Sequence, residues 1–330
     1  MATSILAGVI TLVLVALLYM AVRYTLWKSK KIKALAAVSE VIQTAVGPIE
    51  YRITGSGEAV MLFLPGSPGG YDQFQSSPEL EAAPYRVLTV SRPGYLRTPL
   101  ATGRTPAEQA TAYAALLDAL GIEKVIVMAA SGGGPSGIAF ASMYPERTVG
   151  LITMAAVSQP RMLDEQAAKS QGAGLLDSDF FNWLALGVLS KKDERLVGML
   201  VKGTDNQASM LQDPVGLQMF RRTVLSTQPP SLRKPGFDND NEQFSVLNLP
   251  AESIQVPTLV VHGTEDVNVP FEFSARLARQ IPNAQFAQVD GADHYLRFSH
   301  KAKFDELVTT FVTQVLADSA SGEHAESPSH

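Results

Sequence analysis

The amino-acid sequence predicts an α/β fold with a mostly parallel central sheet. Apolar, β-branched segments of strand length alternate with helical patterns across residues 47–158 and again across residues 254–316. Short turns join these segments, and such alternation is typical of parallel α/β sheets. Two segments stand outside the alternation. One is an uncharged apolar run near the N-terminus, and the other is residues 159–253, which contain no clear strand.

The composition limits the function classes to be considered. The 330 residues suffice for one large domain or two smaller ones, and 46% hydrophobic residues can form a substantial core. A formal net charge of -5 argues against nucleic acid as the main partner. The chain has no cysteine, which excludes disulfides, a thiolate nucleophile and cysteine-ligated metals.

Residues 5–22 predict a membrane-spanning helix. They are uncharged and strongly apolar, and a helix of this length, roughly 27 Å, matches the hydrocarbon thickness of a bilayer. Tyr19, Tyr24 and Trp27 suit an interfacial aromatic belt. A cleavable signal peptide would carry its charge before the apolar run, and a buried core helix would show a polar face. We therefore expect residues 1–33 to form an uncleaved single-pass anchor, with the lipid bilayer as its partner.

A basic cluster predicts the orientation of this anchor. It follows the apolar run and consists of Arg23, Lys28, Lys30, Lys31 and Lys33. Cytoplasmic flanks of spanning helices carry an excess of lysine and arginine, so the catalytic domain is expected on the cytoplasmic side. The same lysines could contact anionic lipid head groups. Residues 34–46 are expected to be a connector, with the ordered domain beginning near Gly47.

The first half of the predicted domain contains five strands and two helices. The strands are expected at residues 48–54, 59–64, 85–91, 125–130 and 149–156. One helix starts at a capping box from Thr105 to Glu108, with Pro106 at its first position, and stops at Gly121. The second helix runs over residues 135–144, directly after a serine and three glycines.

Residues 159–253 predict a mostly helical insertion, or cap, that interrupts the sheet. Helical patterns cover residues 180–189, 194–201 and 215–225. Pro229, Pro230, Pro235 and the polar run 238–241 are typical of loops. The sheet then resumes with strands at 256–262 and 284–289 and helices at 271–280 and about 304–315. Residues 317–330 are rich in serine, glutamate and histidine and are expected to form a disordered tail.

Ser131 lies where a strand turns sharply into a helix. This is the context of a nucleophile elbow, in which small residues are needed two positions before and after the serine. Ala129 and Gly133 occupy those positions. Taken alone, the segment could equally be a glycine-rich turn that closes a parallel sheet or binds a phosphate.

Asp266 and His294 complete a candidate catalytic triad with Ser131. Each follows a different predicted strand, at the carboxyl edge where α/β sheets place their sites. The histidine would remove the serine proton, and the aspartate would orient the imidazole and stabilise its charged form. The N–H groups of Ser67 and Gly132 are the candidate oxyanion donors, because Pro68 has no N–H.

Other acidic residues and histidines are weaker candidates for the roles of Asp266 and His294. Glu265 is the fallback acid, whereas His262 falls inside a strand and is expected to be structural. Asp290 and Asp293 are expected to be solvated turn residues.

Five stretches together resemble the α/β-hydrolase superfamily, over roughly residues 47–316. They are LFLPGSPGG, SRPGYLRTP, MAASGGGPSG, VPTLVVHGTEDVNVP and VDGADHYLRF. The resemblance implies a central sheet of about eight strands and a helical cap over the site. The chain has Pro65-Gly66 where the family usually has His-Gly, and Ala129 where it usually has glycine. The first departure affects loop shape rather than the triad.

The serine nucleophile indicates acyl transfer and disfavours the related epoxide hydrolases and haloalkane dehalogenases, which use aspartate at the elbow. We expect hydrolysis of a small, apolar carboxylic ester. Amide or peptide hydrolysis, as in proline iminopeptidase-like relatives, and C–C bond hydrolysis remain alternatives. So does a non-catalytic binding module with the same fold, although the intact triad argues against it. No cofactor or metal is expected, because the triad itself supplies nucleophile, base and acid.

Overall fold

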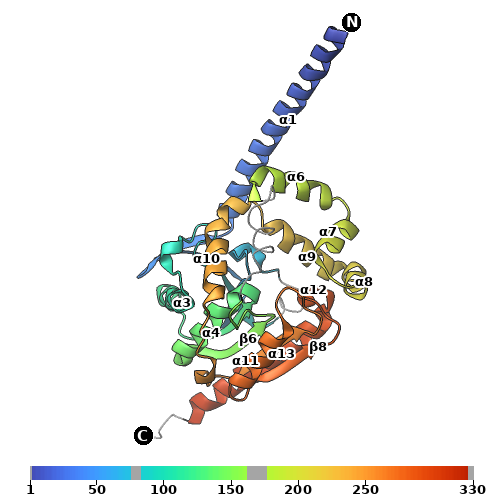
Figure 1. Cartoon of the computed structure of the whole chain (residues 1–330). Coiled ribbons are helices and arrows are strands. Elements are labelled where there is room, and N and C mark those ends of the chain that lie inside the picture. The colour runs from blue at the N-terminus through green and yellow to red at the C-terminus, as the bar shows by residue number, and fades with distance from the viewer. Residues whose placement is uncertain (1, 76–82, 162–176, 326–330) are drawn as a thin grey trace.

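The computed structural model describes residues 2–75, 83–161 and 177–325 of the chain (Figure 1). Its centre is a sheet of eight strands in the order β1-β2-β4-β3-β5-β6-β7-β8. The strands are β1 (Glu40–Thr44), β2 (Gly47–Thr54), β3 (Ala59–Leu64), β4 (Tyr85–Val90), β5 (Val125–Ala130), β6 (Thr148–Met154), β7 (Thr258–Gly263) and β8 (Gln285–Val289). β1 and β2 are antiparallel to their neighbours, and the pairs from β4 to β8 are parallel. The predicted fold class is confirmed.

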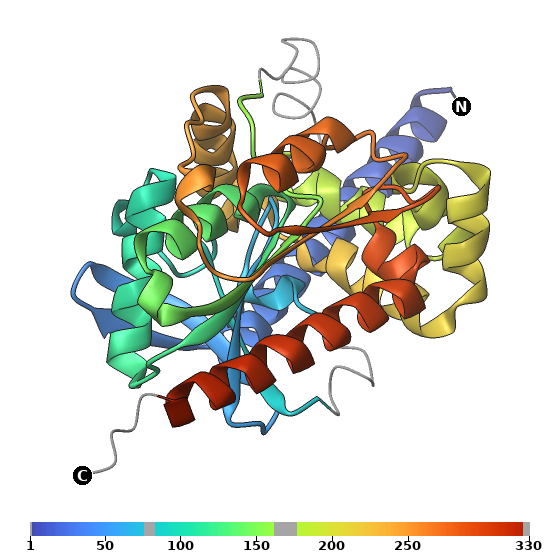
Figure 2. The ribbon, with the colours of Figure 1, turned by 90° about the horizontal axis from the view of Figure 1, so that it is seen from below.

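Helices cover both faces of the sheet. The side chains of each inner strand alternate between the two faces and so contribute to two apolar cores. In β5, Val125, Val127 and Ala129 contact one apolar cluster, and Ile126, Met128 and Ala130 contact the other. The first cluster includes α3 (Pro106–Leu120), α4 (Gly134–Met143) and α11 (Phe271–Gln280). The second includes α13 (Lys301–Ala325), which crosses the opposite face (Figure 2). β5 is thus buried on both sides, which fixes the position of the turn that follows it.

In the described part of the segment between β6 and β7, five α-helices form the cap. They are α6 (Asp179–Leu189), α7 (Asp193–Leu200), α8 (Thr204–Gln212), α9 (Pro214–Ser226) and α10 (Lys234–Ser245). α6, α7 and α9 correspond to the three predicted helices, and their apolar faces share one cluster with Phe298 of the core. This cluster seats the cap over the carboxyl edge of the sheet.

Residues 238–241 were predicted to be a loop, and this prediction was wrong. They lie inside α10, where Pro235 occupies the first turn, a position that needs no N–H donor. Asn239 and Asp240 are buried and bonded to other elements, so tertiary contacts override their weak helix propensity.

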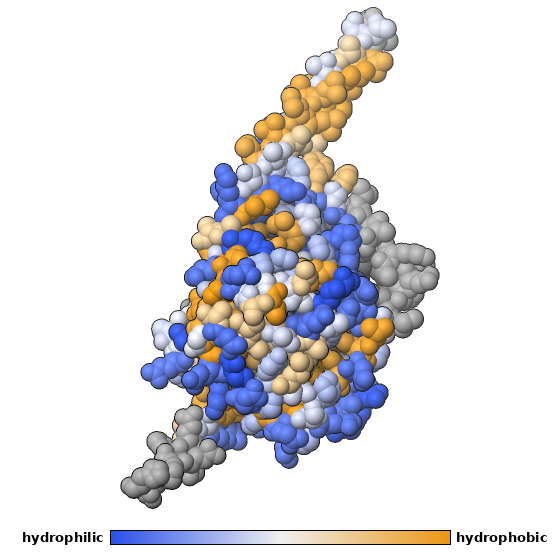
Figure 3. All heavy atoms as spheres, turned by 90° about the vertical axis from the view of Figure 1, so that its left-hand side faces the viewer, coloured by the Kyte–Doolittle hydropathy of each residue, from blue (hydrophilic) through white to orange (hydrophobic). Residues whose placement is uncertain are grey.

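The N-terminal helix α1 (Ala2–Ala37) is a single helix of 36 residues that extends from the body (Figure 1). None of its most apolar window is buried, and the surface of the part that protrudes from the body is mostly apolar (Figure 3). Its last turns contact the body, where Lys31 Nζ donates to Leu225 O at 3.4 Å and Tyr71 Oη donates to Leu35 O at 2.6 Å.

Both ends of the domain differ from the sequence expectation. Helix α1 continues to Ala37, inside the expected connector 34–46. Residues 40–44 of that connector form strand β1. Thr44 Oγ1 donates to Gly47 O at 2.7 Å across the turn, and Gly47 has a φ of 128°, which favours glycine. The expected disordered tail is helical as far as Ala325, and residues 326–330 lie outside the described residues.

Candidate active site

Ser131 occupies a strained turn between β5 and α4. Its φ of 47° lies in the left-handed region that non-glycine residues rarely adopt. Val157 N donates to Ser131 O at 3.0 Å and fixes the turn against the next strand's end. A Cβ at Gly133 would collide with the carbonyl oxygens of Leu64 and Pro65, so only glycine fits there. The turn therefore presents the serine hydroxyl above the sheet edge, at the N-terminus of α4.

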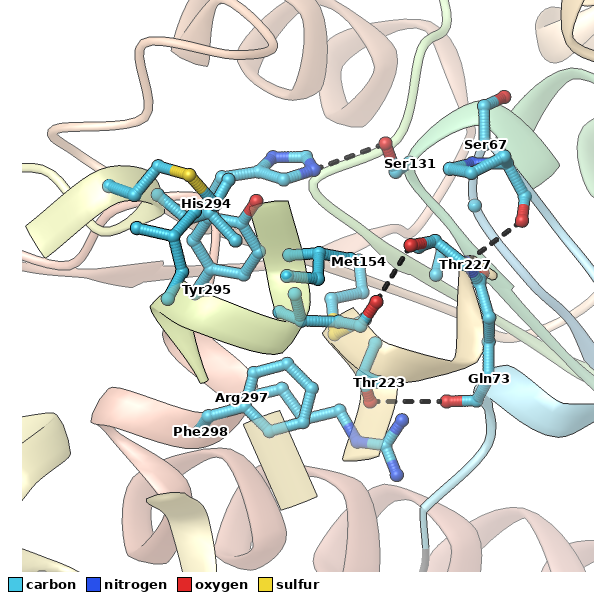
Figure 4. A pocket seen from close by; sticks show the side chains of 18 of the residues that line it. Ser67, Gln73, Ser131, Met154, Thr223, Thr227, His294, Tyr295, Arg297 and Phe298 are labelled. Carbon is cyan, nitrogen blue, oxygen red and sulfur yellow. Dashed lines mark hydrogen bonds between the residues drawn. The ribbon is translucent and has the colours of Figure 1, made fainter. Parts of the chain in front are cut away.

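The structure brings Ser131, His294 and Asp266 together from three separate turns. His294 Nε2 lies 3.1 Å from Ser131 Oγ (Figure 4), and His294 Nδ1 lies 2.7 Å from Asp266 Oδ2. If Nδ1–H donates to the carboxylate, Nε2 is left to accept the serine proton. The three side chains thus form a hydrogen-bonded series in which the histidine can accept the serine proton and the carboxylate can orient the imidazole.

The Asp266 carboxylate is buried but strongly bonded. Its Oδ1 accepts hydrogen bonds from the N–H groups of Asn268 at 2.7 Å and Val269 at 2.9 Å. Burial alone would raise its pKa, but hydrogen bonds from His262, His294 and Val269 hold the pKa of this carboxyl well below its usual range. Asp266 is therefore ionised across the neutral pH range.

His262 supports the turn that carries Asp266. It is fully buried, with Nε2 at 3.0 Å from Asp266 Oδ2 and 3.1 Å from Val269 O. Its Nδ1 lies 2.6 Å from Ser274 Oγ. With Nε2–H as the donor, Nδ1 accepts the hydroxyl proton of Ser274, and the ring links strand, turn and helix. This agrees with the structural role expected for His262.

Asp293, next to His294, was expected to be a solvated turn residue, and this was wrong. Its side chain is only 1% exposed and accepts hydrogen bonds from Lys202 N at 2.9 Å and Tyr295 N at 3.0 Å. Lys202 belongs to the cap and lies 91 residues before Asp293 along the chain. The sequence alone could not show that its N–H donates to this carboxylate.

The candidate oxyanion loop, Gly66 and Ser67, lies against the elbow. A Cβ at Gly66 would lie 3.0 Å from Ser131 Cβ, and a Cβ at Gly132 would lie 3.1 Å from Ser67 N. The two backbones thus approach as closely as glycine permits, and the N–H groups of Ser67 and Gly132 both border Ser131.

Sequence reasoning missed a buried charge network behind this loop. Arg92 donates from Nη1 to Asp240 Oδ1 at 2.9 Å, from Nη2 to Asp240 Oδ2 at 2.5 Å, and from Nε to Pro65 O at 2.8 Å. Ser67 Oγ and Tyr95 Oη both donate to Asp240, and Arg92 Nη2 reaches Ser67 Oγ at 3.1 Å. Arg92, Tyr95 and Asp240 are at most 3% exposed. The network joins cap helix α10 to the oxyanion loop.

A cavity of about 370 Å³ opens beside Ser131 between the cap and the core (Figure 4). Its lining is mostly apolar and combines core residues with cap residues from α6, α7 and α9. The apolar members are Phe63, Ala130, Met154, Ala185, Leu186, Leu189, Met199, Leu200, Val224, Tyr295 and Phe298. A cavity of this size and lining suits a small or medium-sized organic molecule.

Arg297 lies on the side of this cavity away from Ser131 (Figure 4). It is 3% exposed, and burial lowers the pKa of its guanidinium to about 10. One nitrogen donates to Gln75 O, whereas the buried Nε has no partner within residues 2–75, 83–161 and 177–325. Its carbon Cζ lies 4.8 Å from the ring centre of Phe74. Among the described lining residues, Arg297 alone has a permanent charge.

No cluster of histidine, aspartate or glutamate with metal-site geometry occurs among the described residues.

The chain belongs to the α/β-hydrolase fold family, whose model matches residues 59–301. An α/β-hydrolase fold protein from Nakamurella multipartita is 33% identical, with a TM-score of 0.72, and the match covers 82% of this chain and 99% of that one. A 2-hydroxy-6-oxononadienedioate/2-hydroxy-6-oxononatrienedioate hydrolase from Paraburkholderia phymatum is 26% identical over 84% of this chain and 97% of its own length. The uncharacterized hydrolase YcgS of Bacillus subtilis is 37% identical, but the match spans 44% of this chain and about half of that protein (51%).

More distant solved structures share the fold alone. An enol-lactonase from Burkholderia xenovorans and an esterase from Thermogutta terrifontis are each 21% identical, with TM-scores of 0.62. The matches cover 83% and 84% of this chain and 100% and 98% of those chains, respectively. The relatives thus include esterases, lactonases and C–C bond hydrolases, and the chain is a hydrolase of this fold.

The Asp266 carboxylate predicts a pH-dependent contribution to stability. Its folded-state pKa is depressed, so its stabilisation is present above the unfolded value of about 3.9 and is lost as the pH falls further. We expect Asp266→Asn to lower the free energy of unfolding by about 1–3 kcal/mol at neutral pH. The difference from the wild type should shrink below about pH 4. Thermal unfolding across this range measures it, with the exposed Asp290→Asn as control. A difference that does not change with pH would contradict the prediction.

The Arg92–Asp240 pair predicts a large cost for removing one partner. Asp240→Asn leaves a buried guanidinium unpaired, and such changes typically destabilise by about 3–5 kcal/mol. Asp238→Asn is the matched control, because Asp238 lies on the same helix in an exposed pair with Lys234 worth about 1 kcal/mol or less. Denaturant unfolding of both variants compares them. Equal stability of the two variants would show that the network does not hold the cap.

Proposed function

We propose that the protein is a membrane-anchored serine hydrolase that cleaves carboxylic esters through an acyl-enzyme on Ser131. The observation that carries the proposal is the hydrogen-bonded series Ser131–His294–Asp266, set at an apolar cavity under the cap. An esterase and a lactonase among the structures of this fold are consistent with ester chemistry.

In this mechanism, Ser131 Oγ attacks the ester carbonyl while His294 Nε2 takes its proton. The buried Asp266 carboxylate holds the imidazole in the tautomer that can accept this proton and stabilises the imidazolium. The N–H groups of Ser67 and Gly132 stabilise the oxyanion, and one such donor is worth about 100- to 1,000-fold in rate. His294 then protonates the leaving alcohol, and water, activated by the same histidine, releases the acid.

The membrane part of the proposal rests on α1. Residues 5–22 would cross the bilayer, because the most apolar window of α1 has a mean hydropathy of 2.8 and none of that window is buried. The lysines that follow would lie on the cytoplasmic side together with the hydrolase domain. The aromatic side chains of Tyr24 and Trp27 would then lie at the membrane interface.

Hydrolysis of a C–C bond is the second candidate, and two observations favour it. The relative from Paraburkholderia phymatum is named for a dioate substrate, and it matches 84% of this chain. The described lining of the cavity contains one buried cation, Arg297, whose Nε has no hydrogen-bond partner among the described residues. A substrate carboxylate could bind this guanidinium in addition to the nearby buried Asp305, and hydrogen bonds between such charged groups are among the strong ones.

Labelling with a fluorophosphonate probe tests the proposed nucleophile. The wild-type protein should react with the probe and release p-nitrophenol from short-chain p-nitrophenyl esters, and Ser131→Ala should do neither. Ser136→Ala is a matched control on α4, the helix that follows Ser131, because Ser136 is buried and bonded to Gly133 O rather than to His294. Wild-type protein that fails to label would favour a binding module instead.

A substrate panel with Arg297→Met separates the ester and C–C candidates. If the cavity receives a carboxylate, the variant should lose about tenfold or more in kcat/KM toward carboxylate-bearing dienoic ketones, a loss expected of one charged hydrogen bond. Neutral esters should be affected little. Proline amides belong in the same panel to test amide hydrolysis. Activity confined to neutral esters and unchanged in Arg297→Met would count against C–C hydrolysis.

A further inference from the structure

Cap helix α6 presents three different faces, and one of them is exposed and apolar. Asn182, Ala185, Leu186 and Leu189 line the cavity. Phe180 and Trp183 face α1. The third face carries Phe181, Leu184 and Val188, which are 41%, 39% and 47% exposed. Spacings of three and four residues place each set on one side of the helix. Three large apolar side chains thus remain open on a helix of 11 residues.

Aromatic contacts fix α6 at a particular level along α1. The Tyr24 ring lies 5.4 Å from Phe180 and 5.8 Å from Trp183, and the Trp27 ring lies 6.1 Å from Trp183. Lys28 Nζ forms an ion pair with Asp179, the first residue of α6, at 2.5 Å. In Figure 1, α6 runs across the base of α1, where α1 leaves the body. α6 therefore meets α1 just beyond its apolar segment, at the level of the interfacial aromatic residues.

We propose that the exposed face of α6 rests in the surface of the bilayer that α1 spans. This rests on the proposed anchoring by α1 and goes further, because it assigns a second lipid contact to the catalytic domain itself. If residues 5–22 cross the hydrocarbon, Tyr24 and Trp27 lie at head-group level, and the packed α6 must lie there too. Apolar faces of interfacial helices enter the boundary between head groups and acyl chains.

The charges around α6 suit an anionic lipid surface. Lys191 and Lys192 are exposed directly after the C-terminus of α6, and Lys30 and Lys33 are exposed on α1 beyond the aromatic contacts. One pair of ammonium groups thus lies at the C-terminal end of α6 and the other on α1. Lysines next to a membrane surface are attracted by anionic head groups. The combination of an apolar face and flanking lysines fits a lipid surface better than a protein partner.

The contact also defines where a substrate can enter. α6 is one wall of the cavity, and Met199 on α7 both lines the cavity and is 40% exposed. An ester dissolved in the bilayer would meet α6 first and reach the cavity beside it. The proposal thus assigns to the site esters that partition into the membrane.

The absence of cysteine makes a direct measurement possible, since one introduced cysteine carries one nitroxide spin label. The labelled full-length protein would be reconstituted into nanodiscs of phosphatidylcholine with a minority of phosphatidylglycerol. For each position, the accessibility of the label to oxygen and to a water-soluble nickel chelate is measured. Val188→Cys reports on α6, Leu12→Cys on α1, and Val246→Cys, 71% exposed at the end of α10, on the remote surface of the cap.

We expect labels at positions 12 and 188 to favour oxygen and the label at position 246 to favour the nickel chelate. A label at 188 that behaves like the one at 246, while position 12 lies in the bilayer, would overturn the α6 contact alone. A label at 12 that is open to the nickel chelate would overturn the membrane anchoring itself. Neither readout depends on the reaction that the enzyme catalyses.

A kinetic comparison tests the consequence for the substrate. Leu184→Asp places a charge on the exposed face of α6 without touching a cavity residue, and Val246→Asp is its matched control. Leu184→Asp should reduce hydrolysis of a long-chain ester dissolved in the nanodisc by about tenfold, because charged groups enter the interface poorly. Hydrolysis of a water-soluble short-chain ester should stay unchanged. Equal rates of both variants on the bilayer ester would contradict entry from the membrane.

Discussion

The buried pair of Arg92 and Asp240 is the interaction on which the position of the cap over the site depends. Taking two charges out of water is costly, and the cost is offset only where geometry and further hydrogen bonds satisfy both groups. Here the guanidinium binds the carboxylate through two nitrogens and also donates to Pro65 O, while Tyr95 and Ser67 donate to the same carboxylate. Asp240 belongs to the cap, and Pro65 directly precedes the candidate oxyanion loop. A single network therefore holds the cap and this loop in position relative to each other.

The residues of the candidate triad were predictable from the sequence for a topological reason. Parallel strands end at the same edge of a sheet, so turns that follow β5, β7 and β8 meet there although 163 residues separate Ser131 from His294. β5 was visible as an apolar run that ends at a serine and three glycines, β7 as a mostly apolar run between Pro257 and Gly263, and β8 as a short segment between Pro282 and Gly291. Local pattern and topology together were sufficient for the fold class and for the three residues of the candidate triad.

The residues that support the site were not predictable, because their roles depend on contacts between distant elements. Asp240 belongs to a polar run with weak helix propensity, and nothing in its spacing points to Arg92, 148 residues away. Asp293 has the composition of a solvated turn, yet its partner is a backbone N–H of the cap. Strand β1 escaped notice because edge strands with one exposed face lack a continuous apolar run. Burial between distant elements determines the conformation and partners of these residues, and the local sequence pattern does not show which elements will meet.

Asp179 extends the same principle to the side of the cap that packs on α1. Its carboxylate accepts hydrogen bonds from the backbone and hydroxyl of Ser231, at 2.8 and 2.6 Å, and pairs with Lys28 of α1. Burial alone would raise its pKa, but the bonds from Lys28 and Ser231 lower it, so the group is charged and holds α6, the residues before α10, and α1 together. These two buried carboxylates thus tie the cap to the candidate oxyanion loop through Asp240 and to α1 through Asp179. A movement of α6 that widens the cavity must disturb its packing on α1, which would couple access to the site with the position of α1.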